Sequence, residues 1–292
     1  MNRPSPADGD LKRRLDGLYS RYGPGYLHTD PVSVPRSYAE PEDREVAGLI
    51  TAALAYGQVP QIMASVRRVM AIMGDRPAAF VRRFDPRRER ALLRGFVHRF
   101  NDARDMGLLL HFTRQALDRS GSLEGFFLEG YSAGDDDIGP ALSSFVRRML
   151  ALDCAAYYRT GVLPAAAGVR FFLPSPDGGS TCKRLNLFLR WMVRPDDGVD
   201  FGIWRGVSPS KLIIPLDTHV SRIAAAIGLT SRRTAGWKMA REVTGRLRAM
   251  DAGDPVKYDF ALCRLGILDE CPRRRDPVKC RGCELRPHCV LS

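Results

Sequence analysis

Apolar residues recur along this chain at the spacing of one helix face, and this periodicity limits the fold more than any other feature. The first clear stripe, which ends near Gly57, consists of Val46, Leu49, Ile50, Ala53 and Leu54. Comparable patterns begin at Pro60 and cover 77–84, 86–100, 104–119 and 138–152. No segment shows the sustained alternation that strands need, and no internal repeat is present. The sequence therefore predicts an all-α fold.

The segment PLDTHVSRIAAAIGL, residues 215–229, predicts a helix with a defined beginning and end. Asp217 suits the N-cap, because its carboxylate can accept hydrogen bonds from the free backbone amides of the first turn. The buried stripe of this helix would consist of Val220, Ile223, Ala224 and Ile227. Gly228 is expected to end it.

The charge balance favours a polyanionic partner. The chain has 45 Lys and Arg against 33 Asp and Glu, a net charge of +12. Such a surface suits nucleic acid. There is no apolar run of eighteen or more residues and no signal-peptide pattern at the start of the sequence. We therefore expect a cytoplasmic protein with no membrane partner.

Four cysteines crowd into the last 22 residues. Cys271, Cys280, Cys283 and Cys289 follow the pattern C-x8-C-x2-C-x5-C. In a reducing cytoplasm this crowding indicates a metal site and not disulfides. Four thiolates suit either a [4Fe–4S] cluster or a tetrahedral zinc ion, and the spacing alone does not decide between them.

A turn rich in Pro and Gly precedes the central helix, in the segment RFFLPSPDGGSTCKRLNLFLRWMVR. Gly178 and Gly179 lie just before a helix that is expected to begin near Ser180. The core stripe of this helix would be Leu185, Phe188, Leu189 and Met192. On another face, at i, i+7 and i+11, follow Lys183, Arg190 and Arg194.

Three of these patterns resemble one known superfamily. The pattern D-T-H-V-x-R from Asp217 to Arg222, followed by an apolar run and Gly-Leu, resembles the helix after the hairpin in helix-hairpin-helix DNA glycosylases such as endonuclease III and the adenine-mismatch glycosylase. The turn at Gly178 and Gly179 resembles a degenerate form of the L-P-G-V-G hairpin of that family. Both named enzymes end with C-x6-C-x2-C-x5-C around a [4Fe–4S] cluster, so the resemblance favours the cluster over zinc. The segments CKRLNLFLRWMVR and PLDTH are similar to a poorly characterised bacterial branch.

The resemblance implies catalytic roles for two residues. Asp217 would be the catalytic carboxylate. Lys183 would be the nucleophile that attacks the sugar C1′ as a neutral amine, as a Lys does in members that also cleave the strand. A free Lys is protonated at pH 7, so burial or a neighbouring charged group must help it to lose the proton. Lys183 and Asp217 are 34 positions apart, more than in endonuclease III, and Lys211 is a second candidate.

The resemblance also implies contacts with DNA. The amides of Gly178 and Gly179 would approach a phosphate at a helix N-terminus. Gln58 would fill the gap that a flipped base leaves in the stack, and Tyr56 would line the pocket. The other implied DNA contacts are Ser180, Arg184, Arg190, Lys211, His219 and Arg222.

We expect a two-lobed, all-α monomer with duplex DNA in the cleft between the lobes. Its regions would be 1–42, an N-terminal helix and Pro/Gly-rich segment packed with the C-terminal lobe; 43–230, a helical barrel with its hairpin at 173–183; and 231–292, helices and the four-cysteine loop. The expected activity is excision of a damaged base, with an oxidised base favoured and AP lyase activity through a Lys Schiff base as an addition. The sequence does not name the base.

Two alternatives remain open at this point. The chain could be a DNA-binding or redox-sensing iron–sulfur protein that keeps the fold without catalysis. It could also be a zinc-stabilised helical module with an RNA partner.

Overall fold

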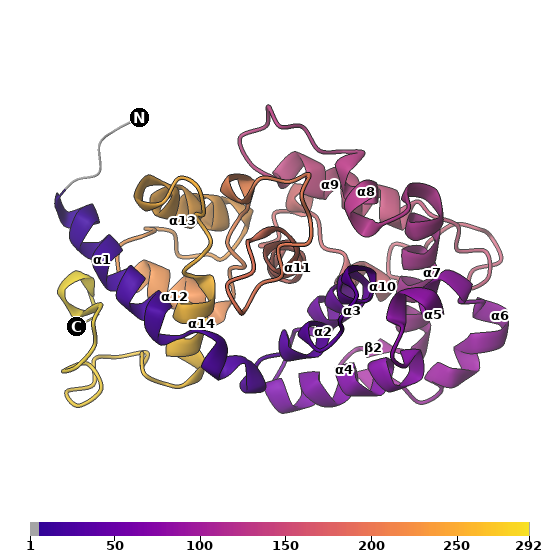
Figure 1. Cartoon of the computed structure of the whole chain (residues 1–292), viewed down its shortest axis with the longest axis horizontal. Helices are drawn as coiled ribbons and strands as arrows, with labels where there is room; N and C mark the ends of the chain where they lie inside the picture. Colours follow the sequence, from indigo (N-terminus) through magenta and orange to yellow (C-terminus); the bar gives the residue numbers. More distant parts are fainter. Residues whose placement is uncertain (1–5, 292) are drawn as a thin grey trace.

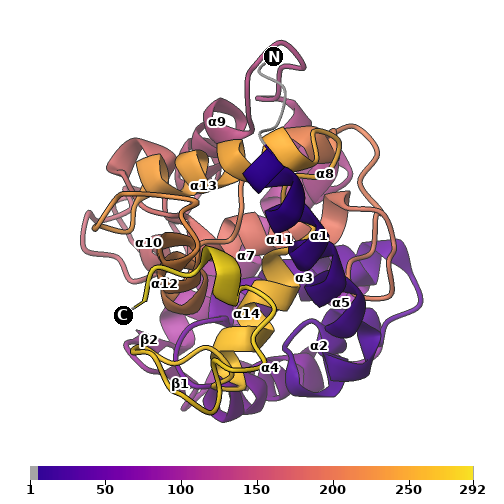
Figure 2. The same ribbon diagram turned by 90° about the vertical axis from the view of Figure 1, so that its left-hand side faces the viewer.

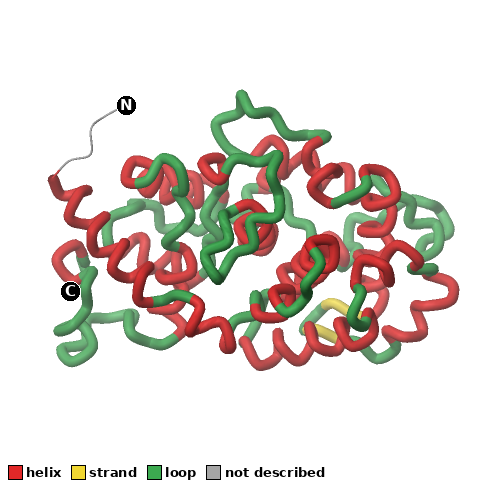
Figure 3. The backbone as a smooth tube through the Cα atoms, in the orientation of Figure 1, coloured by secondary structure: helices red, strands yellow, loops and turns green. Residues whose placement is uncertain are grey.

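The computed structural model of the chain describes residues 6–291 and is built almost entirely of helices and loops (Figure 3). Helix accounts for 56% of the structure and strand for 1%, so the prediction of an all-α protein is confirmed. Within residues 6–291 no helix combines the length and the apolar character needed to cross a bilayer.

The elements follow one another along the chain with connections of varied length, the longest of which are 151–168 and 268–285. The α-helices are α1 (Pro6–Arg21), α2 (Ser33–Arg36), α3 (Pro41–Leu54), α4 (Val59–Met73), α5 (Pro77–Arg83), α6 (Pro86–Glu89), α7 (Ala103–Ser120), α8 (Leu123–Leu128), α9 (Gly139–Leu150), α10 (Val169–Phe172), α11 (Lys183–Val193), α12 (Thr218–Ala226), α13 (Trp237–Met250) and α14 (Asp259–Ile267). The 3-10 turns are η1 (Pro24–Thr29), η2 (Arg90–Leu93), η3 (Pro176–Gly178), η4 (Pro209–Lys211) and η5 (Arg286–His288). The strands β1 (Val97–His98) and β2 (Asn101–Asp102) form one antiparallel hairpin.

The two ends of the sequence meet at one end of the molecule. Figure 1 places α1 beside α12, α13 and α14 at the left, with α5, α6 and α7 at the right and α11 between the two groups. The end-on view in Figure 2 shows α1 running past α14, against which it packs. Arg14 Nη1 donates to Glu284 O (2.8 Å), and Asp10 Oδ2 lies 2.8 Å from His288 Nε2. The N-terminal helix is therefore fastened to the cysteine-bearing tail.

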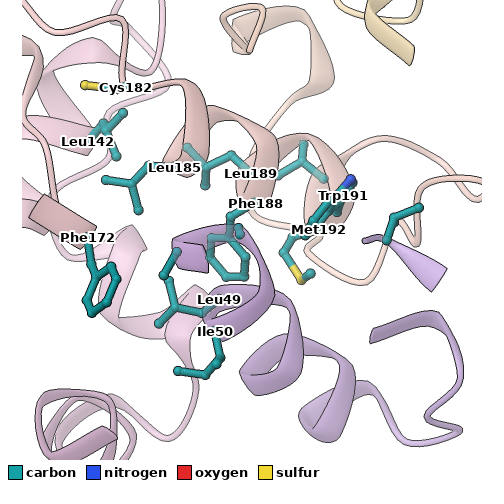
Figure 4. Packing of buried hydrophobic residues seen from close by; sticks show 14 of the residues in the cluster. Leu49, Ile50, Leu142, Phe172, Cys182, Leu185, Phe188, Leu189, Trp191 and Met192 are labelled. Carbon is teal, nitrogen blue, oxygen red and sulfur yellow. The ribbon is translucent and has the colours of Figure 1, made fainter. Parts of the chain in front are cut away.

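The centre of the core is the contact between α3 and α11. Figure 4 shows Phe188 and Met192 of α11 directed toward α3, the helix that carries Leu49 and Ile50. All four side chains are buried, and Phe188 is 1% exposed. The two helices approach closely at Gly48, where an added Cβ would lie 2.6 Å from Met192 Cε. This packing sets the position of the first turn of α11, where Lys183 lies.

One predicted helix is broken. The apolar pattern over 86–100 predicts a continuous helix, but the chain forms α6, η2 and then the hairpin of β1 and β2. Gly95 has φ +71 and Arg99 φ +57, and neither value is compatible with a right-handed helix. Val97 and Phe100 are exposed, so part of the apparent core stripe lies at the surface.

Replacement of Phe188 by Ala should lower the free energy of unfolding by about 3–5 kcal/mol, because a buried ring is lost and a cavity remains between α3 and α11. Urea unfolding measures the change. Phe100→Ala is the matched control: its ring is 60% exposed and makes an edge-on contact with Phe171 (4.4 Å between ring centres), so its loss should cost only about 0.5–1.5 kcal/mol. Equal effects of the two replacements would contradict the assignment of the core.

Candidate active site

Asp217 caps the helix that the sequence predicts. Its Oδ1 accepts from the Val220 N–H (2.8 Å), and α12 begins at Thr218. The predicted apolar stripe of α12 is buried, and Gly228 follows the helix with φ +74. The second carboxylate oxygen, Oδ2, accepts from Cys263 Sγ of α14 at 3.7 Å. One oxygen is thus committed to the fold, while the other faces a neighbouring helix.

Lys183 is the first residue of α11. The helix begins there, and not near Ser180, because Cys182 adopts a left-handed conformation (φ +49) and its N–H donates to Ser180 Oγ (3.1 Å). Lys183 is half-buried, and its Nζ donates to Ala55 O (3.1 Å) just after the end of α3. The ammonium is therefore positioned by backbone from another helix.

Two cavities meet at Lys183 and Asp217. The larger is an open cleft of about 1010 Å³, and the smaller is a pocket of about 440 Å³. Their shared lining consists of Ala55, Gly57, Lys183, Asp217 and His219. Both volumes lie in or near the range of ligand sites in proteins. An amine, a carboxylate and an imidazole thus occupy the passage between a groove and a pocket.

The larger cleft carries the positive charge. Its basic lining consists of Lys183, Arg184, Arg222, Arg232 and Arg233, and Ser180 and Thr181 lead into the N-terminus of α11 beside them. Arg232 and Arg233 are exposed, whereas Arg184 is buried. Arg232 is ion-paired with Glu242 (2.6 Å), so Arg233 is the exposed guanidinium of this lining with no carboxylate partner among the described residues. A helix N-terminus and an exposed guanidinium both favour an anion.

The guanidinium of Arg184 is held between backbone and aromatic rings. It donates to Ala53 O (3.3 Å) and to Phe171 O, and it lies 3.9 Å from the centre of the Phe171 ring and 4.9 Å from that of Tyr56. Burial lowers the pKa of Arg184 to about 10, so it stays protonated at neutral pH. Tyr56 itself lines the cleft. Arg184 therefore supports the wall of the cleft more than it reaches into it.

The smaller pocket is lined by residues from α4, α11 and α14. Gln58 stands exposed at its rim, directly before α4. Asp259, Phe260 and Cys263 line it from α14. Burial, with Asp217 and Asp259 nearby, raises the pKa of the Cys263 thiol well above its usual value, so the thiol stays protonated and donates to Asp217.

The sequence predicts that Arg190 is available to contact DNA, and this prediction is wrong: neither Arg190 nor Arg194 is exposed. Both are buried, at 2% and 3% exposure. Arg190 pairs with Asp200 and Asp259, and Arg194 with Asp197, Asp200 and Asp254. Because a buried guanidinium needs carboxylate partners, these ion pairs hold the side chains inside. Arg190 is therefore not available to a phosphate.

Three other predicted contacts are also placed differently. Lys211 Nζ donates to Asp135 O (2.5 Å) and lines neither cavity. The N–H groups of Gly178 and Gly179 donate to Ser175 O and Pro176 O within η3 and its turn, so they are not free for a phosphate. In contrast, His219 lines both cavities, and Arg222 lines the cleft.

Two residues of the site, Asp259 and Cys263, are absent from the sequence-based predictions. They lie one turn apart on α14 and come to Asp217 only through the tertiary fold. Their one local signal is that they stand at i and i+4 in a helix whose only other ionisable residue is Arg264.

The four tail cysteines surround one cavity. Cys271, Cys280, Cys283 and Cys289 all line a space of about 120 Å³. Arg222 Nη1 donates to Cys271 Sγ (3.5 Å), and the Asp276 N–H donates to Cys280 Sγ (3.4 Å). Among residues 6–291 no three His, Cys, Asp or Glu side chains gather as the ligands of a metal ion. The thiols thus frame a space and do not converge on a point.

A family model describes the chain from residue 30 to residue 268 as DUF2400, a protein of unknown function. The chain belongs to this family. The match covers all the lining residues of the junction and ends before Cys271. No curated protein and no solved structure matches the chain.

Membership of the helix-hairpin-helix DNA glycosylase superfamily, which the motifs suggested, is therefore wrong: the matching family is DUF2400. The motifs behind that resemblance are short. The pattern from Asp217 to Arg222 is largely explained by an N-cap and a buried stripe, which many helices share. The function of this protein is therefore inferred from the geometry of its own site.

Asp217→Asn should leave the free energy of unfolding nearly unchanged, since the amide oxygen can still cap α12, whereas Asp217→Ala should lower it by about 1 kcal/mol. Denaturant unfolding of both variants measures this structural part of the role of Asp217. A large loss with Asn would contradict a simple cap. The pair also supplies a folded variant, Asp217→Asn, for tests of chemistry.

Proposed function

We propose that this protein is a DNA glycosylase that removes a damaged base from duplex DNA, with AP lyase activity through a Schiff base on Lys183. The observation that carries the proposal is the junction of the two cavities at Lys183, Asp217 and His219. A base that leaves the stack needs a pocket, its backbone needs a basic groove, and the sugar between them needs the reactive groups.

The larger cleft fits a phosphate backbone. Its exposed Arg233 offers charge, as does Arg232 beside its partner Glu242, and the first turn of α11 offers backbone amides; the chain carries a net charge of +12. Such contacts position nucleic acid without reading its sequence. The smaller pocket, with Phe260 for an apolar face and Gln58 at the rim, would receive the base.

The chemistry follows from the two reactive groups. Asp217 accepts a proton from the Lys183 ammonium or stabilises positive charge that develops on the sugar. The neutral amine forms a bond to the sugar C1′ while the bond from C1′ to the base breaks, and the base leaves with the electrons of that bond. The bond from C1′ to the ring oxygen then breaks as a proton passes from the Lys183 nitrogen to that oxygen, and the iminium that forms on Lys183 permits β-elimination, which nicks the strand.

Borohydride should trap a covalent adduct between the protein and a duplex that carries an abasic site or an excised lesion. The duplex panel is 8-oxoguanine, an oxidised pyrimidine, uracil and a preformed abasic site. Lys183→Ala should abolish the adduct, because borohydride reduces the Schiff base on that amine. Lys211→Ala should retain it, because the ammonium of Lys211 lies outside both cavities.

Asp217→Asn should lower the rate of base release by about 10²- to 10⁴-fold, the usual loss when a general base is removed. Alkali-labile sites that depend on Asp217, without an adduct, would mean base excision without the lyase step. Binding without product on any duplex would contradict the proposal.

We propose in addition that the tail holds a [4Fe–4S] cluster and that the protein works in a reducing compartment such as the cytoplasm. The support is a cavity framed by four free thiols, with an N–H donor to the sulfur of Cys271 and another to that of Cys280. A cluster needs volume between its ligands, while a single zinc ion needs thiolates about 2.3 Å from one point.

Protein purified without oxygen should contain iron and sulfide and show the broad visible absorbance of a cluster. Cys280→Ser should remove most of that absorbance, whereas Cys154→Ser, a buried thiol outside this cavity, should leave it unchanged. Zinc in place of iron, with no visible band, would support the alternative ligand.

A second candidate is a DNA-binding, redox-sensing protein without catalysis. One observation favours it: Arg222 lines the cleft and donates to Cys271 Sγ and to Cys271 O (2.6 Å), so the tail and the cleft share a side chain. DNA affinity that depends on cluster oxidation, with no product in the trapping panel, would be its signature.

A further inference from the structure

Asp259 is a buried acid in the smaller pocket with one oxygen unused. It begins α14, is 3% exposed, and lines the pocket together with Asp217 and Lys183. Its Oδ2 accepts from Arg190 Nη1. Its Oδ1 is buried and has no hydrogen-bond partner within residues 6–291. A buried polar atom without a partner is costly, and in a pocket it marks the place where a ligand atom would bind.

The surroundings of Asp259 keep a proton on it near neutral pH. The charged or titratable groups around it, including those that line the same pocket, are Arg190 and Lys183 from α11, Asp200 after α11, Asp217 before α12, His219 from α12, Asp30 after η1, and Cys263 and Arg264 from α14. Burial is the largest influence, and the carboxylates of Asp217 and Asp200 add to it. Against the opposing effect of Arg190, they raise the pKa of Asp259 to about 7.

We propose that Asp259 is the general acid that protonates the base as it leaves, an inference that rests on the proposed glycosylase function. The bond between C1′ and the base breaks, and its electron pair goes with the base. Asp259 Oδ1 gives its proton to a ring nitrogen or carbonyl oxygen of that base and becomes a carboxylate paired with Arg190. Water returns the proton after release.

The two carboxyl groups of the site therefore have different tasks. Asp217 accepts from the Val220 N–H and the Cys263 thiol, while Asp259 Oδ1 has no donor in the part of the chain that the structure describes. Two acids in one pocket whose environments differ in this way serve as proton donor and as charged group. The substrate class follows: a damaged base with a proton acceptor on the edge that faces α14.

The test is the pH dependence of base release in single-turnover reactions of the full-length protein with duplexes that carry 8-oxoguanine, thymine glycol or uracil. The donor must be protonated, so the rate should be constant below about pH 7 and fall about tenfold per pH unit above it. Asp259→Asn should lower base release at pH 6 by about 10²- to 10⁴-fold and remove this fall.

Asp254→Asn is the matched control. Asp254 belongs to the ion pairs of Arg194, outside the pocket, and its loss should leave the fall where it is. The borohydride adduct at a preformed abasic site is the second readout. No base leaves in that reaction, so a folded Asp259→Asn should form the adduct as the wild type does.

The outcomes separate this proposal from the proposed function. A wild-type pH profile in Asp259→Asn would overturn the acid role and leave the glycosylase proposal standing. Loss of both base release and the abasic-site adduct in Asp259→Asn would mean a structural role and would also overturn it. Failure of the wild type on every duplex would overturn both.

Discussion

The site depends on buried contacts of Arg190 that join α11 to α14. Arg190 of α11 binds Asp200 and Asp259, and Arg194, just after the end of α11, binds Asp197, Asp200 and Asp254. Loss of either guanidinium costs about 3–5 kcal/mol, because its carboxylate partners are left buried without a counter-charge. The contact between Arg190 and Asp259 holds α14 against α11 beside the smaller pocket. It therefore sets where Cys263 of α14 meets Asp217, while the packing of α11 on α3 places Lys183.

Local chemistry made part of this structure predictable. The N-cap at Asp217 needs only its own helix, and the sequence predicted both it and the buried stripe of α12. The helix predicted over 86–100 was wrong, because an apolar pattern does not show that the backbone at Gly95 and Arg99 has a positive φ. The predicted exposure of Arg190 and Arg194 was wrong for another reason. Two of their carboxylate partners, Asp259 and Asp254, lie about 60 or more positions away in the sequence, and the spacing of residues on one helix does not show such partners. Asp259 belongs to the site only because the tertiary fold brings α14 against α11 and Asp217, and no local pattern shows this.

The family match covers the junction of the two cavities but not the four-cysteine tail. The residues around Lys183 and Asp217 lie within the segment that matches DUF2400, whereas the four cysteines lie beyond its end at residue 268. Arg222 spans the two, since it lines the cleft and donates to the backbone and sulfur of Cys271. The tail also contacts α12 directly, since the Val290 N–H donates to Ala226 O (2.8 Å). The junction and the tail are thus separate sites, joined by direct contacts between the tail and α12.

The fastening of α1 bears on how the chain reaches this structure. Asp16 accepts from the Tyr258 hydroxyl across 242 positions, and Arg14 from the same helix reaches Glu284 across 270. Contacts of such separation close a loop of nearly the whole chain, which is slow and entropically expensive before other elements are in place. On a ribosome α1 therefore leaves the exit tunnel long before the helix against which it packs. The face of α1 that meets α14 stays uncovered until the chain has been made as far as Ile267.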